Sequence, residues 1–216
     1  MKIGILGTGA VGKTIGTRLV ALGHEVKMGS RTAANEKAME WVKTSGKNAS
    51  TGTFADAASF GEIVFNCTKG EVALDALRLV GKENLKNKIL IDVSNPLDFS
   101  KGFPPSLTVC NTDSMGEMIQ REFPETKVVK SLNTMNCAIM LDPAKVAGDH
   151  SVFVSGNDKD AKEQVKKFLE SCGWKGSNIY DLGDITSSRG VEQLLPFWVR
   201  MYGAFGHANF NFNIVK

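Results

Sequence analysis

The sequence predicts an α/β protein with a doubly wound, mainly parallel sheet, and three observations support that fold class. Short apolar runs recur along the 216 residues and alternate with segments of helical periodicity. The runs are almost wholly apolar, which is typical of parallel strands covered by helices on both faces. A glycine-rich motif directly follows the first run. The preferred right-handed crossover between parallel strands then makes a doubly wound sheet the natural arrangement.

The elements are expected in a regular order. The expected strands are Lys2–Leu6, Glu25–Met28, Gly52–Phe54, Ile63–Cys67, Ile89–Val93, Val128–Leu132, Val152–Val154 and Ile179–Leu182. The expected helices are Val11–Leu22, Ala33–Thr44, Glu71–Val80, Asp160–Ser171 and Val191–Phe205. Residues 1–185 are expected to form one sheet domain, and residues 186–216 a short helical C-terminal extension packed on that domain or on a dimer partner.

Composition excludes several function classes. The net charge is only +3 and the basic residues are scattered, so neither nucleic acid nor a membrane surface is expected as a partner. The chain opens as a strand, without an apolar leader, so a cytoplasmic protein is expected. The four cysteines form no CxxC pair and the three histidines do not cluster, so we expect reduced, buried thiols and no metal site.

The glycine motif is Gly7-Thr8-Gly9-Ala10-Val11-Gly12, a complete GxGxxG. It lies between an expected strand and an expected helix, the context in which this motif binds a dinucleotide. Gly7 would allow the tight turn, Gly9 the approach of a pyrophosphate, and Gly12 close packing of helix on strand. The helix N-terminus would offer unpaired N–H groups to the phosphates. The fold is therefore expected to be of the Rossmann type.

The end of the second strand indicates which dinucleotide is bound. An NAD site places a carboxylate there for the ribose hydroxyls. This sequence has Met28-Gly29-Ser30-Arg31-Thr32 instead. Arg31 can form a charge-assisted fork with a 2′-phosphate, and Ser30 and Thr32 can donate hydrogen bonds to it. NADP(H) is therefore expected rather than NAD(H).

Three further strand ends are expected to line the same crevice, because ligands bind at the carboxyl edge of a parallel sheet. Their small polar residues can approach ribose and nicotinamide without crowding them. The candidate cofactor-binding residues there are Cys67, Thr68 and Lys69, then Ser94, Asn95 and Pro96, and finally Asn133 and Met135.

The glycine loop, the GSR at Gly29–Arg31, the SNPL at Ser94–Leu97 and the SLNTM at Ser131–Met135 together resemble the deazaflavin (coenzyme F420)-dependent NADP oxidoreductases. The tail, with Leu195-Pro196 and the segment 198–213, is similar to bacterial NADP-dependent reductases. The resemblance covers essentially the whole chain. The GSR after a GTGxxG start is its most specific element, and it recurs in the cytosolic NADPH domains of membrane metalloreductases.

The resemblance implies that hydride moves between nicotinamide C4 and deazaflavin C5. It places Thr8, Ser30 and Arg31 at the 2′-phosphate and residues 9–12 at the pyrophosphate. Thr68 and the residues Ser94, Asn95 and Pro96 would flank the nicotinamide, and Asn133 and Met135 would touch nicotinamide and deazaflavin. One departure concerns the phosphate clamp. Relatives often carry a lysine four or five positions after the arginine, where this chain has Asn35 and Glu36, with Lys37 nearby.

No catalytic residue is expected, because hydride transfer between two planar rings needs positioning and exclusion of water more than acid–base chemistry. His24 and His150 are expected to be structural, and Asp92 to be a strand-end hydrogen-bonding residue. Two interpretations stay open for His207, which either faces the pocket or lies outside it. The acceptor also stays open between a deazaflavin and a flavin.

Two rival functions remain. A hydroxyacid dehydrogenase or imine reductase would need a large helical C-terminal domain, which the length after Asn133 does not favour. An NADP(H)-sensing or electron-delivery module would need the cofactor crevice but no acceptor pocket. Trp198, Tyr202 and Phe205 lie at helical spacing and are expected in the core or in a homodimer interface.

Overall fold

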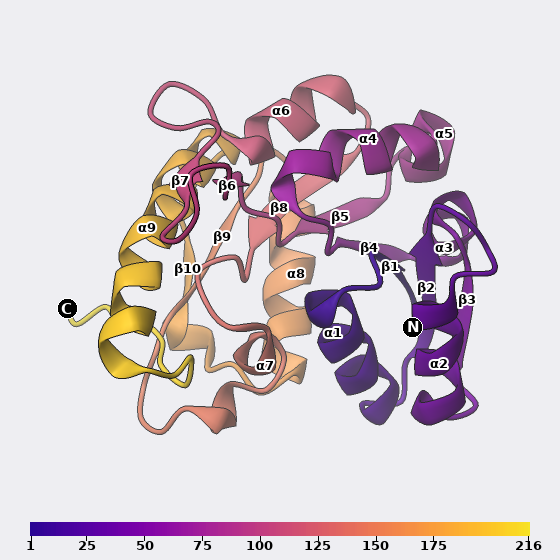
Figure 1. Ribbon diagram of the computed structural model, residues 1–216, viewed down its shortest axis with the longest axis horizontal. Coiled ribbons are helices and arrows are strands. Elements are labelled where there is room, and N and C mark those ends of the chain that lie inside the picture. Colours follow the sequence, from indigo (N-terminus) through magenta and orange to yellow (C-terminus); the bar gives the residue numbers. More distant parts are fainter.

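The computed structural model describes residues 1–216 and contains one eight-stranded sheet (Figure 1). The strand order is β10-β9-β8-β5-β4-β1-β2-β3. The strands are β1 Lys2–Leu6, β2 Glu25–Ser30, β3 Ala49–Thr53, β4 Ile63–Asn66, β5 Ile89–Asp92, β8 Lys127–Ser131, β9 Val152–Ser155 and β10 Ile179–Asp181. The doubly wound, mainly parallel sheet is confirmed.

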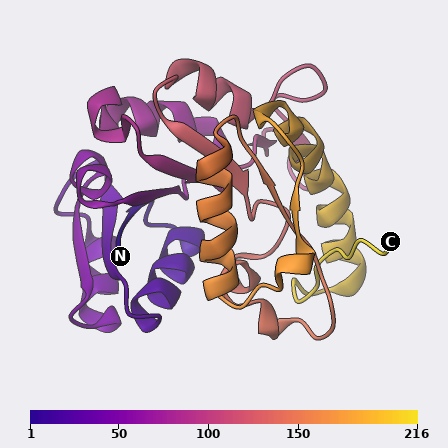
Figure 2. The same ribbon diagram turned by 180° about the vertical axis from the view of Figure 1, so that it is seen from behind.

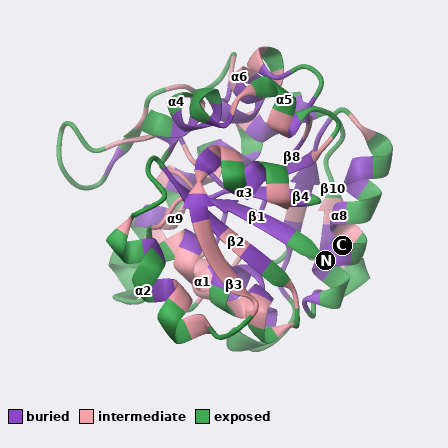
Figure 3. Ribbon diagram, turned by 90° about the vertical axis from the view of Figure 1, so that its right-hand side faces the viewer, coloured by how far each residue is buried: buried purple, intermediate pink, exposed green.

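Helices cover both faces of this sheet (Figure 2). The helices α1 Ala10–Ala21, α2 Glu36–Ser45, α7 Cys137–Met140 and α8 Lys159–Ser171 pack into one core cluster. The helices α3 Phe54–Phe60, α4 Gly70–Val80, α5 Lys82–Leu85 and α6 Met115–Glu122 pack into the other. The inner strands are buried, as the purple ribbon of β1 shows in Figure 3, whereas the edge strand β3 is mostly of intermediate exposure.

One junction in the sheet departs from the expected parallel series. The strands β8 and β9 pair antiparallel, with Lys130 opposite Ser155. The chain between them forms only the four-residue α7 and the short 3₁₀ helix Pro143–Lys145, and neither is a long crossover helix of the kind that joins parallel strands. An antiparallel pair needs no such crossover. The last two strands, β9 and β10, are again parallel.

Several short elements were not expected. Besides α3, α5, α6 and α7 they include the small hairpin of β6 Leu97–Asp98 and β7 Ser106–Leu107, and the 3₁₀ helices Gly176–Asn178 and Ile185–Ser187. The third strand was placed too late in the sequence, because residue 54 already begins α3. A capping box between Thr53 and Asp56 stops the strand and starts the helix there.

The C-terminal extension begins with α9 Ser188–Phe205, which lies against α6 and the β6–β7 hairpin. Residues 206–216 follow without regular secondary structure. They are tied to β9 by the N–H of Ser151, which donates to the Phe212 carbonyl at 2.8 Å. None of the helices combines the length and the apolar character that a membrane span requires.

Candidate functional site

The glycine loop joins β1 to α1 with little room for side chains. Gly7 has φ +118°, a conformation that side chains rarely adopt. A Cβ on Gly12 would lie 2.1 Å from the Gly7 carbonyl oxygen, whereas a Cβ on Gly9 would meet nothing within 4 Å. The space beside Gly9 is open to a ligand. No side chain caps the N-terminus of α1 and its first turn carries no acidic residue, so its free N–H groups suit a pyrophosphate.

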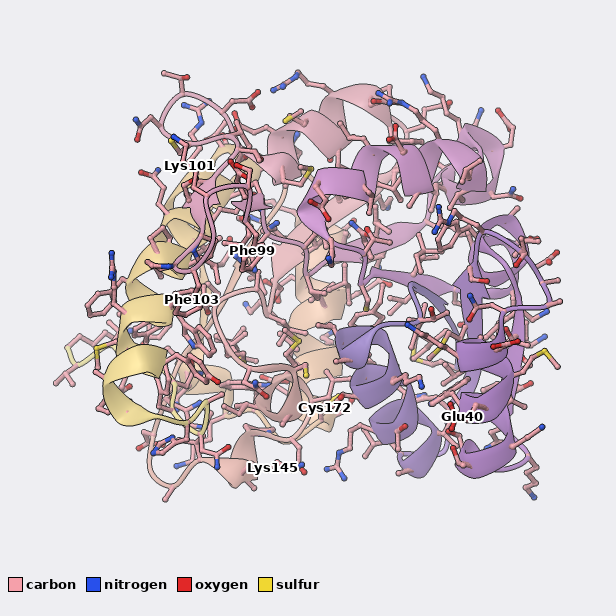
Figure 4. The ribbon with its side chains drawn as sticks, in the orientation of Figure 1. Glu40, Phe99, Lys101, Phe103, Lys145 and Cys172 are labelled. Atoms are coloured by element: carbon pink, nitrogen blue, oxygen red, sulfur yellow. The ribbon has the colours of Figure 1, made fainter.

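A cavity of about 320 Å³ lies at the carboxyl ends of β1, β4 and β5. It brings together eight of the candidate residues: Gly9, Ala10, Val11, Cys67, Thr68, Lys69, Ser94 and Asn95. Its remaining lining was not predicted and consists of Gly70, Glu71, Val93, Leu97 and Phe99. Figure 4 places Phe99, Lys101 and Phe103 on the segment between β6 and β7, beside α9. This loop borders the cavity on the side away from β2.

A larger cavity of about 510 Å³ lies along α1, beside α2 and α7. Glu40 and Lys145 mark its place in Figure 4. Four of its five charged residues are paired with one another, since Lys13 lies 3.7 Å from Glu40 and Arg18 lies 3.6 Å from Asp142. None of the candidate residues lines it. The smaller cavity is therefore the better candidate for the cofactor site.

The end of β2 lies outside the cavity, on the far side of the glycine loop. Arg31 and Thr32 are exposed, and Arg31 forms no ion pair with a carboxylate. Ser30 is buried, and its hydroxyl donates to the Thr32 carbonyl at 2.5 Å, so it shapes this turn. Asn35 accepts a hydrogen bond from the Ala38 N–H and thereby caps the N-terminus of α2.

Polar groups fix the ends of β4 and β5. Asn66 Nδ2 donates to Asp92 Oδ1 at 2.8 Å, and the Thr68 hydroxyl donates to Asn66 Oδ1 at 2.6 Å. Asp92 Oδ1 also accepts the Ser94 hydroxyl at 2.8 Å. Asp92 is fully buried, so it acts as the expected strand-end hydrogen-bonding residue. Thr68 and Ser94 are thereby held at the cavity.

The residues that follow β8, the third of the predicted strand ends, lie behind the cavity and do not line it. Asn133 is buried and exchanges two hydrogen bonds with Asn95, each 2.9 Å long, so it supports the cavity from behind. Met135 packs in the core cluster and does not line the cavity. Pro96 is also buried, and its carbonyl accepts the Thr108 N–H at 2.8 Å, which anchors the β6–β7 hairpin.

Two buried charged residues near the site were not predicted. Lys130, on β8, lies 2.8 Å from Asp92 and 2.8 Å from Glu192, which is on α9. A lysine inside an otherwise apolar strand was the available signal for the first. Nothing in the sequence pattern connects that lysine with Glu192, because only the fold brings α9 against the end of β8.

The cysteines correct one expectation. Cys67 and Cys172 are buried, but Cys110 is exposed and Cys137 is only partly covered. Burial raises the pKa of Cys67, with smaller contributions from the charge of Asp92 and from Cys137. Its thiol therefore stays protonated in the cavity lining. Burial likewise raises the pKa of Cys172 to about 11.

The histidines lie away from the cavity. His150 is buried, stacks edge-on against Trp174 and has Asn211 at 2.9 Å from its Nδ1 atom, as expected of a structural residue. His207 is exposed in the tail beside Phe205 and does not line the cavity. No group of three or more His, Cys, Asp or Glu residues could hold a metal ion.

The fold and the glycine loop define a dinucleotide-binding protein, and comparisons with known proteins narrow the class. The family model described as NADP oxidoreductase, coenzyme F420-dependent, matches residues 2–96. A solved structure from Arthrobacter sp. FB24, assigned to the F420-dependent NADP reductases, is 51% identical with a TM-score of 0.94. The alignment covers 100% of both chains.

Two curated relatives agree with this result. The F420-dependent NADP reductase of Methanothermobacter marburgensis is 26% identical over 212 residues, which are 93% of this chain and 92% of that protein. Metalloreductase STEAP3 of Rattus norvegicus is 31% identical over 204 residues, 91% of this chain. The match spans only 38% of the metalloreductase's length.

The chain belongs to the coenzyme F420-dependent NADP oxidoreductase family. It is an NADP-dependent oxidoreductase, and its cofactor is NADP(H).

Proposed function

We propose that the protein transfers hydride between NADP(H) and a deazaflavin or flavin-like acceptor within the cavity at the ends of β1, β4 and β5. The observation that carries the proposal is the alignment of three features along one sheet edge. Arg31 lies at the end of β2, the open glycine loop follows β1, and the cavity extends from that loop to β5. In doubly wound folds a dinucleotide binds across this same carboxyl edge of the sheet.

The residues present fit this cofactor. Arg31 would bind the 2′-phosphate, with Thr8 and Thr32 beside it and Ser30 shaping the turn. Gly9 would leave room for the pyrophosphate beside the N–H groups of Ala10, Val11 and Gly12, while Gly7 would form the tight turn and Gly12 would allow close packing of helix on strand. The rest of the predicted set, Cys67, Thr68, Lys69, Ser94, Asn95, Pro96, Asn133 and Met135, would line or support the nicotinamide end.

When bound, NADPH supplies a hydride from nicotinamide C4 and becomes NADP⁺. The chain's own contribution would be positioning and exclusion of water, because hydride transfer between two planar rings needs little acid–base chemistry. Thr68 and Ser94, each held by a buried partner, would orient the nicotinamide. The exposed aromatic ring of Phe99 at the rim offers a face on which a planar acceptor could stack.

The acceptor is tested by offering purified protein NADPH together with coenzyme F420, FMN, FAD or a quinone in separate reactions. Consumption of NADPH with F420 is the expected result and would support the deazaflavin. Turnover only with a flavin or quinone would keep the reductase and change its acceptor. Tight NADPH binding without turnover on any of them would favour the sensing or electron-delivery module.

A further inference from the structure

A buried charge network lies directly behind the cavity. Asp92 on β5, Lys130 on β8 and Glu192 on α9 have side chains that are at most 2% exposed. Lys130 Nζ lies 2.8 Å from Asp92 Oδ2 and 2.8 Å from Glu192 Oε1. It also donates to the Ser94 carbonyl at 2.6 Å. One ammonium group therefore joins two strands, the C-terminal helix and the cavity lining.

Such a network is costly to bury, because three charges must leave water. Its geometry offsets that cost. The backbone N–H groups of Met115 and Gly116, at the start of α6, donate to Glu192 at 2.9 and 3.1 Å. Burial alone would lower the pKa of Lys130, but attraction to Asp92 and Glu192 outweighs it and raises the pKa. The ammonium group is thus charged at neutral pH.

The network acts on one segment of the cavity. Asp92 Oδ1 accepts both the N–H and the hydroxyl of Ser94, at 3.2 and 2.8 Å, while Lys130 holds the Ser94 carbonyl. A second tie runs in parallel, since Asn133 bonds to Asn95 and donates to the Val191 carbonyl at 3.2 Å. Consecutive residues of α9, Val191 and Glu192, are therefore connected to consecutive cavity residues, Ser94 and Asn95.

We propose that Lys130 is a positioning residue that fixes Ser94 at the nicotinamide end of the cavity and, through Glu192, couples the position of Ser94 to α9. The inference rests on the proposed binding of NADP(H) in this cavity. Lys130 lines no part of the cavity itself, so it acts through Ser94. The C-terminal extension then contributes to the cofactor site without touching it.

The test compares two ligands that share the phosphate end of the cofactor. Dissociation constants are measured for NADPH and for 2′-phospho-ADP-ribose, which lacks the nicotinamide, with wild-type protein, Lys130→Met and Glu192→Gln. If the network positions the nicotinamide end, both variants should bind NADPH more weakly, about tenfold for Lys130→Met. Their dissociation constants for 2′-phospho-ADP-ribose should stay within about twofold of the wild-type value. The hydride-transfer rate in a single turnover should fall at least as much.

The matched control is Arg189→Met. Arg189 also joins α9 to α6, through its Nε atom 2.8 Å from Glu117, but it has no link to Ser94. It should loosen the same helix junction and leave the ratio of the two dissociation constants at the wild-type value. Glu192→Gln keeps the size of the side chain and an acceptor for the α6 N–H groups. It therefore tests the positioning role on its own if Lys130→Met does not fold.

Two outcomes would overturn the inference. One is a ratio of the two dissociation constants that stays at the wild-type value in both network variants, as an equal loss of both ligands would give. The other is the same shift of that ratio in Arg189→Met. Failure of the proposed function would look different, because the wild-type protein itself would then bind NADPH no better than it binds the fragment.

Discussion

Gly9 and Gly12 lie three residues apart in one loop but are required for different reasons. Gly9 has φ −76°, which alanine adopts readily, and a Cβ there meets no protein atom. Gly12 has no such space, because the Gly7 carbonyl lies 2.1 Å from its would-be Cβ. The sequence motif predicts the same division, with Gly9 for the approach of a pyrophosphate and Gly12 for packing of helix on strand, and the space around each residue agrees with it.

This separation makes a paired prediction. Gly9→Ala should leave the free energy of unfolding within about 1 kcal/mol of wild type, the scale of a helix N-cap change, while NADPH binding falls sharply. Gly12→Ala should destabilise the fold itself. Urea unfolding and NADPH titration of both variants check this. Unchanged NADPH affinity in Gly9→Ala would contradict the placement of the pyrophosphate.

Arg31 carries the cofactor preference. Its guanidinium is exposed and unpaired with any carboxylate, so it is available to a 2′-phosphate. Arg31→Ala should weaken NADPH binding by roughly 10- to 150-fold, the equivalent of about 1.5–3 kcal/mol for a charged contact, and leave NADH binding nearly unchanged. Titration of both cofactors measures it, with Arg200→Ala, an exposed arginine on α9, as the control. An equal effect on NADH would exclude Arg31 as the selective contact.

Among the secondary-structure elements, the positions of the strands were easier to predict from the sequence than those of the helices. Seven of the strands could be placed within about two residues, because buried apolar runs bounded by polar residues allow few alternatives. The helix α3 was missed although Thr53 and Asp56 carry the capping signal, since its seven residues are too short to show periodicity. The antiparallel pairing of β8 with β9 was also missed, because two buried apolar strands look alike whatever their direction.

The contact between α6 and α9 predicts a pH-dependent stability. The hydrogen bonds from Arg189 hold the pKa of Glu117 below its ordinary value, with a further contribution from Ser114. A lowered folded-state pKa stabilises the fold above the unfolded value, about 4.3, and this stability is lost as the pH falls through the folded value. Wild type should therefore exceed Arg189→Met in unfolding free energy at pH 7, and the difference should shrink below about pH 4. A difference that stays constant down to pH 3 in urea unfolding would contradict the assignment.

At the scale of the whole molecule, α9 and the tail form the part least specified by the sequence. Trp198, Tyr202 and Phe205 were expected in the core or in a homodimer interface, and none of the three is fully buried within the single chain. Trp198 is half-buried and stacks on Tyr202 and Phe210, while Phe197, Tyr202 and Phe205 are exposed. Burial of a helix face at the end of a chain depends on what it packs against, and periodicity does not contain that information.

An exposed aromatic face of this kind suits a self-complementary interface, so the homodimer remains a prediction. Light scattering should give twice the mass of one chain, and Phe205→Ser should shift the protein toward the monomer. Arg200→Ser, on the same helix, is the matched polar control. A molecular mass equal to one chain at every concentration tested would contradict the predicted homodimer.

The glycine loop and the ends of β1, β4 and β5 could be predicted because order along the chain determines which edge of a parallel sheet each strand end reaches. The network of Lys130 and Glu192 could not, because it joins distant segments whose contact only the complete fold creates. The central proposal is that hydride moves directly from NADPH to a planar acceptor bound in the same cavity.

The most direct test uses NADPH carrying deuterium at the transferred C4 position, with coenzyme F420 as acceptor. The hydride that leaves C4 would form a carbon–hydrogen bond at C5 of the deazaflavin, while the ring nitrogen takes a proton from water. We predict that mass spectrometry finds one deuterium retained in the reduced deazaflavin after turnover in ordinary water. Reduced deazaflavin without deuterium, or NADPH that binds but is never consumed, would contradict the account.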